Sequence, residues 1–467
     1  MATNPLRNIP SVNELLENPH LQALIEKVSR HAVVTRVRTI LDDLRQEVQN
    51  AAADIKLPSV AELAENIAHR ILQTERPSLR PVINATGVLL HTGLGRAPLA
   101  EEAIAEMAAV ARDYASVELD LAGGRRSQRV EAVQDLLQEL TGAEAALVVN
   151  NNAGATMLAL AALAAGREVI VSRGQLIEIG GSYRLPDVMS ASGAILREVG
   201  TTNKTRIADY EQAVCDQTGA LLLVHPSNFV VAGFAESVSL AELVRLGRPH
   251  NLPVIHDIGS GALIDFAQFG FSDEPLAAAS IKQGADLVLF SGDKLLGGPQ
   301  CGILIGKRSH VETIARHPLT RALRVDKLTL AALAATLRLY RDPEQAKRSI
   351  PLLHFLSTPI ENLKGRAERL APQMAACQAI AKAEAVADTT YLGGGSVPTQ
   401  QLATWCVALS PREMSVDKLA ARLRAGKPAI VGRVRDERLY LDLRTIFPRQ
   451  DLELVSAVQA LADAEAL

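Results

Sequence analysis

The sequence predicts an α/β protein with a mostly parallel sheet, preceded by a helical domain and followed by a small α+β domain. Short apolar runs such as AALVVN (145–150), EVIVS (168–172) and ADLVLF (285–290) alternate with alanine-rich helical patterns. Such runs are typical of strands that are buried on both faces. The 467 residues are enough for two or three domains.

The first domain, residues 1–78, carries helical patterns. SVNE (11–14) and SVAE (59–62) both match the capping box, in which a hydroxyl and a carboxylate satisfy free amides at a helix start. Apolar residues at helical spacing lie between them: Val37, Ile40, Leu41, Leu44 and Val48. RPSLRPVINATG (76–87) contains two prolines and predicts a linker.

The second domain, residues 79–345, contains the alternating pattern. Further strands are predicted in GALLLVHPSN (219–228) and LPVIHDIGSG (252–261), and a long helix at 326–345 closes the domain. The third domain, residues 346–467, has mixed patterns, with strands predicted in ATWCVAL (403–409) and RLYLDL (438–443).

Composition excludes several classes of protein. A hydrophobic content of 48% and a net charge of −3 are ordinary for a globular protein and give no sign of bulk polyanion binding. We expect a cytoplasmic protein, because the chain begins without a signal peptide pattern and no apolar stretch is long enough to span a bilayer. The four cysteines fit no zinc spacing, so no metal is expected.

A candidate phosphate site lies in VVNNNAGATM (148–157). Ala153, Gly154 and Ala155 open a helix directly after a strand, which leaves free backbone N–H groups at the positive end of the helix dipole. The same pattern would also arise if this helix start only packed its small residues against the sheet and bound no phosphate.

Two charged residues follow strands in the same region. Asp257 ends an apolar strand, where open α/β sheets place their ligands, although it could also cap a loop. Lys294 lies in the glycine-rich turn FSGDKLLGGPQCG (290–302), either as a surface charge or as a reactive amine.

Together these three elements match the requirements of pyridoxal 5'-phosphate. The helix start would hold the phosphate, Lys294 would form the Schiff base, and Asp257 would keep the ring nitrogen protonated. Ser291, in the same turn as Lys294, is a further candidate for cofactor binding.

Other catalytic motifs are incomplete in the sequence or absent from it. SGDK (291–294) is also Ser-x-x-Lys, the nucleophile motif of β-lactamases, but the companion motifs Ser-Asp-Asn and Lys-Thr-Gly are absent from the sequence. GLGRAP (93–98) lacks the third glycine of a dinucleotide fingerprint, and neither a Walker A nor an HExxH motif occurs.

Several blocks closely resemble the bacterial selenocysteine synthase family, the L-seryl-tRNA(Sec) selenium transferases. The resemblance runs nearly end to end and is carried by INATGVLLHTGLGRAPL (83–99), VNNNAGA (149–155), SRGQLIEIGGSYRLPDVM (172–189), FSGDKLLGGPQCGILIG (290–306), RALRVDKLTL (321–330) and GGGSVPTQ (393–400). It implies a fold-type-I, aspartate-aminotransferase-like, pyridoxal-phosphate-dependent transferase.

The resemblance also implies the reaction. Seryl-tRNA(Sec) would displace Lys294 from the cofactor, and the freed amine would remove the α-proton. Loss of the serine hydroxyl would give a cofactor-bound aminoacrylyl-tRNA, to which selenium from selenophosphate adds. Two alternatives stay open: a related pyridoxal-phosphate-dependent lyase acting on a small amino acid or amino sugar, and an RNA-binding scaffold with a vestigial lysine site.

Further site residues are implied by the resemblance. Arg96, Arg321 and Arg324 are candidates for binding selenophosphate, with the last two expected on one helix face, although each could form a surface ion pair instead. Gln175 would cover the cofactor ring. His225 and Asn228 would contact the ring oxygen or the substrate, although His225 could equally be a core histidine.

Recognition of tRNA and assembly are implied only by the family. Its members use the amino-terminal helical domain to recognise the tRNA and assemble as a ring of dimers, a homodecamer. Charge alone does not mark that domain, because the first eighty residues carry ten basic and ten acidic side chains. The segment 422–444 is more basic, with seven Lys/Arg against three Asp/Glu.

Overall fold

The structure is a computed structural model. It describes residues 9–50, 58–74, 79–127, 129, 131–176, 178–179, 183–226, 229, 231, 233–393 and 396–462. The chain forms two compact units, Met1–Pro81 and Val82–Leu467. None of the described helices combines the length and the apolar character that crossing a bilayer requires.

The amino-terminal unit is helical, as predicted. Both predicted capping boxes form, since the Glu14 amide donates to Ser11 Oγ at 3.2 Å and the Glu62 amide donates to Ser59 Oγ at 3.3 Å. Apolar residues of all the helices share one core. The helices are α1 (Val12–Leu16), α2 (Pro19–Lys27), α3 (Arg30–Asn50) and α4 (Val60–Thr74).

The larger unit contains a seven-stranded sheet in the order β4-β12-β11-β10-β9-β5-β8. All its strands run parallel except β12, which is antiparallel to both of its neighbours, so the predicted mostly parallel sheet is confirmed. The strands are β4 (Ala145–Val149), β5 (Glu168–Ser172), β8 (Ile195–Val199), β9 (Thr218–Val224), β10 (Val254–Gly259), β11 (Leu287–Ser291) and β12 (Gly302–Gly306).

Alternate side chains of these strands enter two apolar layers. In β9, Leu221 and Leu223 belong to one core, whereas Ala220, Leu222 and Val224 belong to the other. Helices α7 (Asn152–Ala164), α8 (Leu185–Ala191) and α12 (Arg308–Arg316) supply the second core. The first is supplied by α5 (Glu101–Arg112), α6 (Glu131–Thr141), α9 (Ile207–Ala213), α10 (Leu240–Gly247), α11 (Ala277–Gln283), α14 (Lys327–Leu339), α15 (Pro343–Ser349) and α16 (Pro351–Ser357).

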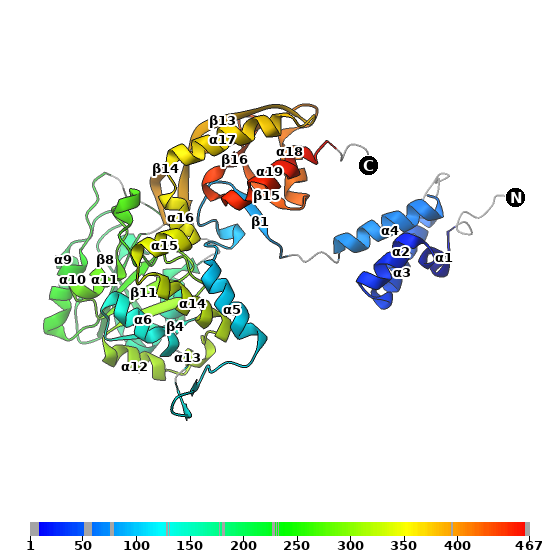
Figure 1. Ribbon diagram of the computed structural model, residues 1–467. Helices are drawn as coiled ribbons and strands as arrows, with labels where there is room; N and C mark the ends of the chain where they lie inside the picture. The colour runs from blue at the N-terminus through cyan, green and yellow to red at the C-terminus, as the bar shows by residue number, and fades with distance from the viewer. Residues whose placement is uncertain are drawn as a thin grey trace. The chain divides into compact units, whose positions relative to one another are not determined.

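A second sheet has the order β1-β15-β16-β14-β13 and its own core (Figure 1). Its first strand, β1 (Val82–Ala85), falls within the predicted linker, because the apolar side chains of Ile83 and Ala85 enter this core and the strand pairs in parallel with β15. The other elements are β13 (Ile380–Gly393), β14 (Ser396–Pro411), β15 (Ala429–Arg435), β16 (Arg438–Asp442), α17 (Ile360–Ala375), α18 (Val416–Ala425) and α19 (Asp451–Gln459).

Candidate active site

A cavity of about 310 Å³ lies at the carboxyl ends of β4, β9, β10 and β11. In a parallel sheet this edge is where ligands bind. Six of the residues that the sequence singled out line the cavity together: Arg96, Ala153, His225, Asp257, Ser291 and Lys294.

Lys294 is placed by the tight turn that follows β11. The Gly292 amide donates to the carbonyl of Cys301, and the Leu295 amide donates to the carbonyl of Ser260 at 3.0 Å. Gly292 has no room for a side chain, because a Cβ atom there would collide with the Cys301 sulfur, and Gly297 has a φ of +69°. Glycine at these two positions therefore allows the tight turn that carries Lys294.

The side chain of Lys294 is mostly buried and lines the cavity. The residue is 7% exposed, and none of the described residues hydrogen-bonds to its Nζ. Burial lowers the pKa of Lys294, and the Arg96 charge lowers it further, whereas the carboxylates of Asp257, Asp293 and Glu274 raise it. A lysine with a lowered pKa is a nucleophile or a base nearer neutral pH.

Asp257 lies at the end of β10 and is 5% exposed. Its Oδ1 accepts hydrogen bonds from Asn152 Nδ2 at 2.9 Å and from the Gly259 amide at 3.0 Å, and its Oδ2 accepts one from Thr156 Oγ1 at 2.9 Å. Burial raises the pKa of Asp257, and these donors and Lys294 partly offset that rise. A buried carboxylate of this kind favours a cationic partner.

The helix start at α7 differs in detail from the prediction. The Gly154 amide already donates to Asn151 Oδ1 at 2.7 Å, and the Ala155 amide donates to the Asn151 carbonyl at 3.0 Å. The amides of Asn152 and Ala153 precede these bonds and lie in the first turn, where backbone donors lack intrahelical partners. An anion at this helix start would therefore meet Asn152 and Ala153 rather than Gly154 and Ala155.

Arg96 enters the cavity from a distant segment. Its Nη1 lies 2.7 Å from Asp293 Oδ2, and Ser291 Oγ donates to the other oxygen of Asp293 at 2.7 Å. Arg96 has a φ of +62°, a conformation that is uncommon for a residue with a side chain and is often found at functional sites.

The three residues predicted to contact the cofactor ring differ in where the structure places them. His225 lines the cavity, and burial lowers its pKa to about 4. Gln175 is buried, but its Oε1 accepts a hydrogen bond from the Val224 amide at 3.0 Å, and the residue lines a neighbouring hollow. Asn228 lies outside the described residues.

Arg321 and Arg324 do not line the cavity, and their predicted helical spacing is wrong. Helix α13 (Leu319–Ala322) ends before Arg324, which forms a β-bridge with Val149 and lies 3.9 Å from Glu118 Oε1. The helix ends because the Leu323 carbonyl accepts a hydrogen bond from the Asn150 amide at the end of β4. Both residues are exposed.

Four further residues belong to the site. Asn152, Tyr183 and Gln300 line the cavity, and buried Glu274 acts electrostatically on Lys294. Burial and the Asp257 charge raise the pKa of Tyr183. Asn152 and Tyr183 lie in the motif blocks given above, whereas Glu274 follows a turn and carries no sequence signal.

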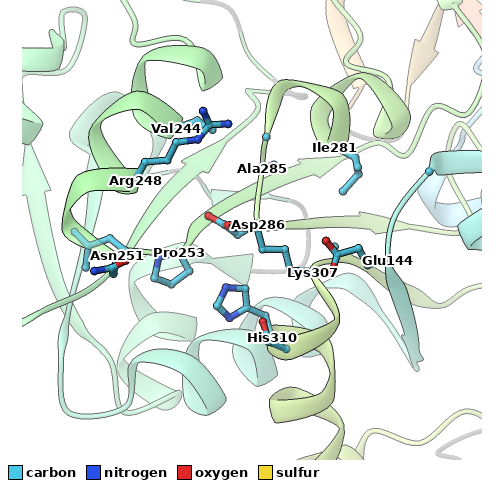
Figure 2. Close-up of a pocket in the computed structure, with 16 residues that line it drawn as sticks. Glu144, Val244, Arg248, Asn251, Pro253, Ile281, Ala285, Asp286, Lys307 and His310 are labelled. Atoms are coloured by element: carbon cyan, nitrogen blue, oxygen red, sulfur yellow. The ribbon is translucent and has the colours of Figure 1, made fainter.

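A second hollow, of about 420 Å³, lies at the amino ends of β4, β10 and β11. Figure 2 shows Lys307 and Asp286 side by side within it, and their ion pair is 2.5 Å long. The Val254 amide also donates to Asp286, at 2.8 Å. Because Lys307 is already paired, the described residues of this hollow offer no free amine comparable to Lys294.

The residues of the Lys294 cavity fit pyridoxal phosphate. They provide a buried amine without a hydrogen-bond partner among the described residues, first-turn amides for a phosphate, and a buried carboxylate that favours a cation. Among the described residues that line the cavity, Asn152 Oδ1 and His225 Nε2 are buried without a hydrogen-bond partner. No described group of His, Cys, Asp and Glu side chains could hold a metal ion.

Known sequences of one family match nearly the whole chain. Residues 82–447 match the family described as L-seryl-tRNA selenium transferase, and residues 6–45 match the family described as selenocysteine synthase N terminal. The L-seryl-tRNA(Sec) selenium transferase of Moorella thermoacetica is 50% identical over 99% of this chain and 98% of that protein. Those of Carboxydothermus hydrogenoformans (46% identical; 95% of each chain) and Hyphomonas neptunium (45% identical; 98% of this chain, 99% of that protein) are similar as well.

Among solved structures, D-glucosaminate-6-phosphate ammonia-lyase shares the fold. It superposes with a TM-score of 0.57 over 83% of this chain and 97% of that chain, at 20% sequence identity.

Proposed function

The chain belongs to the L-seryl-tRNA selenium transferase family, and from this we propose that the Lys294 cavity is the active site in which seryl-tRNA(Sec) becomes selenocysteinyl-tRNA(Sec). The supporting observation is the buried amine of Lys294 beside the buried carboxylate of Asp257. Identity of 45–50% over nearly full length favours this function over that of a lyase for small amino acids or amino sugars.

The cofactor is pyridoxal 5'-phosphate, which supplies an aldehyde for an amine and a ring that accepts electrons. In our proposal the amides of Asn152 and Ala153 bind its phosphate, and Asp257 holds a proton at its ring nitrogen. Lys294 is the amine within the same cavity.

Lys294 also moves the proton of the reaction. Its Nζ removes the proton from the seryl α-carbon, after which the β-hydroxyl takes up a proton and leaves as water. Selenide then adds to the β-carbon, and hydrolysis of the P–Se bond of the donor releases phosphate. We propose selenophosphate as the selenium donor and Arg96 as its first contact, because a guanidinium binds phosphate through two parallel hydrogen bonds. Arg321 and Arg324 would contribute only if the bound substrate draws these exposed side chains toward the start of α7.

The remaining assignments concern the whole molecule. We assign tRNA recognition to the amino-terminal helical unit. We keep the division of the rest into 79–345 and 346–467 as a proposal: two apolar cores support two parts, although Ile83 and Ala85 enter the second core and α15 and α16 enter the first. A homodecameric ring of dimers and a cytoplasmic location, where aminoacyl-tRNA is used, complete the proposal.

The test is substrate choice. The purified chain, loaded with pyridoxal phosphate, should convert seryl-tRNA(Sec) in the presence of selenophosphate and leave free serine unchanged. Conversion of free amino acids or amino sugars, with no reaction of the charged tRNA, would favour the lyase instead.

A further inference from the structure

A hollow of about 500 Å³ adjoins the Lys294 cavity. Val224, the last residue of β9, and His225 line both spaces. Buried Gln175, which accepts the hydrogen bond from the Val224 amide, lines the hollow as well. The hollow and the cavity therefore meet at the carboxyl end of β9.

The proposed substrate is larger than the Lys294 cavity. Pockets for small ligands generally measure about 300–1,000 Å³. The cavity, at about 310 Å³, lies at the lower end of this range, so the cofactor and a seryl group would fill it. In a charged tRNA the seryl group is an ester of the ribose of the terminal adenosine, at the end of the single-stranded sequence CCA. This nucleoside therefore needs an adjoining space.

The lining of the hollow suits an uncharged ligand. Glu236 and Asp273 bring carboxylates to it, whereas no Lys or Arg is among its described lining residues. Burial lowers the pKa of His225 to about 4 and that of His256 to about 3, so both of these lining rings are neutral at neutral pH. A phosphate group would meet no cation in the hollow, but a nucleoside carries no charge.

The hollow offers separate contacts for the two parts of a nucleoside. The hydroxyl groups of Thr202 and Ser237 form no hydrogen bond with a described residue, so they are available to the hydroxyl groups of a ribose. Leu223, Phe229 and Val231 supply apolar surface to the same lining. Such surface contacts the flat face of a base.

An exposed aromatic ring lies next to the rim of the hollow. Phe234 is 87% exposed, and its carbonyl accepts a hydrogen bond from Nδ2 of Asn203, a lining residue, at 2.6 Å. Phe234 lies at the tip of a tight turn, because the Ala235 amide donates to the carbonyl of Gly233, whose φ is +95°. Lys204 Nζ lies 5.7 Å from the centre of the Phe234 ring. Proteins bind single-stranded nucleic acids with this combination of an aromatic ring and a cation.

We propose that the hollow binds the terminal adenosine of the charged tRNA, that the Phe234 ring stacks on the base before it, and that Lys204 contacts a phosphate of this strand. The seryl ester then enters the Lys294 cavity past His225. The inference rests on the proposed function, in which the substrate carries a nucleoside to this place. Because every tRNA ends in CCA, the site contributes affinity and orientation but does not choose among tRNAs.

The test compares three forms of uncharged tRNA(Sec): one with the complete CCA end, one without the terminal adenosine, and one without CCA. Their affinities for the full-length chain loaded with pyridoxal phosphate are measured by filter binding at one salt concentration. The affinity of the wild type should fall about fivefold or more at each shortening, because stacking contributes affinity base by base. A wild type that binds all three forms equally overturns the inference.

Two sets of variants assign the two losses of affinity. Phe234→Ala and Phe234→Leu, which lack an aromatic face, should reduce the loss between the second and third forms, whereas Phe234→Trp should keep it. Ser237→Trp fills the hollow and should abolish the loss that follows removal of the adenosine. Leu452→Ala removes another exposed apolar side chain, in α19, and should bind all three forms like the wild type. Losses in Phe234→Ala and Ser237→Trp that equal those of the wild type overturn the inference.

The phosphate contact has its own measurement. Lys204→Gln should weaken binding of the complete tRNA and reduce by about one the slope of log affinity against log salt concentration. An unchanged slope removes Lys204 from the site.

Uptake of pyridoxal phosphate shows whether each variant keeps its fold. If Ser237→Trp takes up none, Thr202→Trp fills the hollow from another segment and should give the same result. The binding experiment needs neither serine nor selenium. A wild-type chain that fails to convert seryl-tRNA(Sec) therefore overturns the proposed function, whereas unchanged affinity losses in the variants overturn the role of the hollow alone.

Discussion

Arg96 and Asp293 form an ion pair of 2.7 Å between residues that are 197 positions apart in the chain. Asp293 directly precedes Lys294. Arg96 lies in the segment that follows β1, a strand of the second sheet. The pair therefore joins the INATG block to the lysine turn, the two motifs that carry the family resemblance most specifically.

Replacement of Arg96 tests its role in anion binding. Arg96→Ala should raise the KM for selenophosphate by about 10- to 100-fold, since hydrogen bonds to charged groups contribute about 1.5–3 kcal/mol. It should also destabilise the fold, because Asp293 is buried and would lose its cationic partner. Arg338→Ala, which breaks an exposed ion pair with Glu106, is the control and should change neither quantity appreciably. A KM for selenophosphate that is unaffected by Arg96→Ala removes Arg96 from the donor site.

Asp257→Asn tests the role of the buried carboxylate in the reaction. A neutral amide no longer favours a protonated ring nitrogen, so removal of the α-proton should be slower by about 10²- to 10⁴-fold. The measurement is exchange of the seryl α-proton with solvent deuterium. Equal exchange rates in the variant and the wild type would show that Asp257 does not act on the ring.

Asp257→Asn should also change how the stability of the folded chain depends on pH. The pKa of Asp257 is raised in the folded chain, so the folded state binds its proton more tightly than the unfolded state does. The stability that Asp257 confers is thus present at low pH and is lost as the pH rises through the raised pKa. Without cofactor, Asp257→Asn should therefore gain in Tm relative to the wild type between about pH 4 and neutrality. A Tm difference that stays constant with pH contradicts the raised pKa.

The two-unit division predicts the outcome of a truncation. Val82–Leu467 is a compact unit with its own cores, so a chain without residues 1–81 should fold and take up pyridoxal phosphate normally. Its affinity for tRNA(Sec), measured by filter binding, should fall by about tenfold or more, because phosphate contacts dominate affinity for nucleic acids. Undiminished tRNA affinity would place recognition in Val82–Leu467.

Much of the fold could be predicted because the buried strands are continuous apolar runs. EVIVS coincides with β5, and the runs around 145–150 and 285–290 coincide with β4 and β11. The sequence did not indicate strand β1, because INATG follows two prolines. The strand that pairs with β1, β15, also lies far along the chain. No local pattern reveals a pairing between residues 82 and 429.

The centre of the candidate site could be predicted from strand ends, but its surroundings could not. Lys294, Asp257 and Ala153 line one cavity because they lie at the carboxyl ends of β11, β10 and β4, at one edge of the sheet. Glu274 was missed, because a glutamate after a turn is normally solvated and only tertiary packing buries this one. The i,i+3 spacing of Arg321 and Arg324 predicted that both lie on one helix face. This prediction is wrong, because the Leu323 carbonyl accepts a hydrogen bond from the Asn150 amide at the end of β4 and the helix ends before Arg324.

The most direct test of the account is the identity of the lysine that binds the cofactor. Borohydride reduction of the chain loaded with pyridoxal phosphate, followed by peptide mapping, should place the label on Lys294, and Lys294→Ala should remain folded and unlabelled. Label on another lysine, or a wild-type chain that takes up no pyridoxal phosphate, would contradict it.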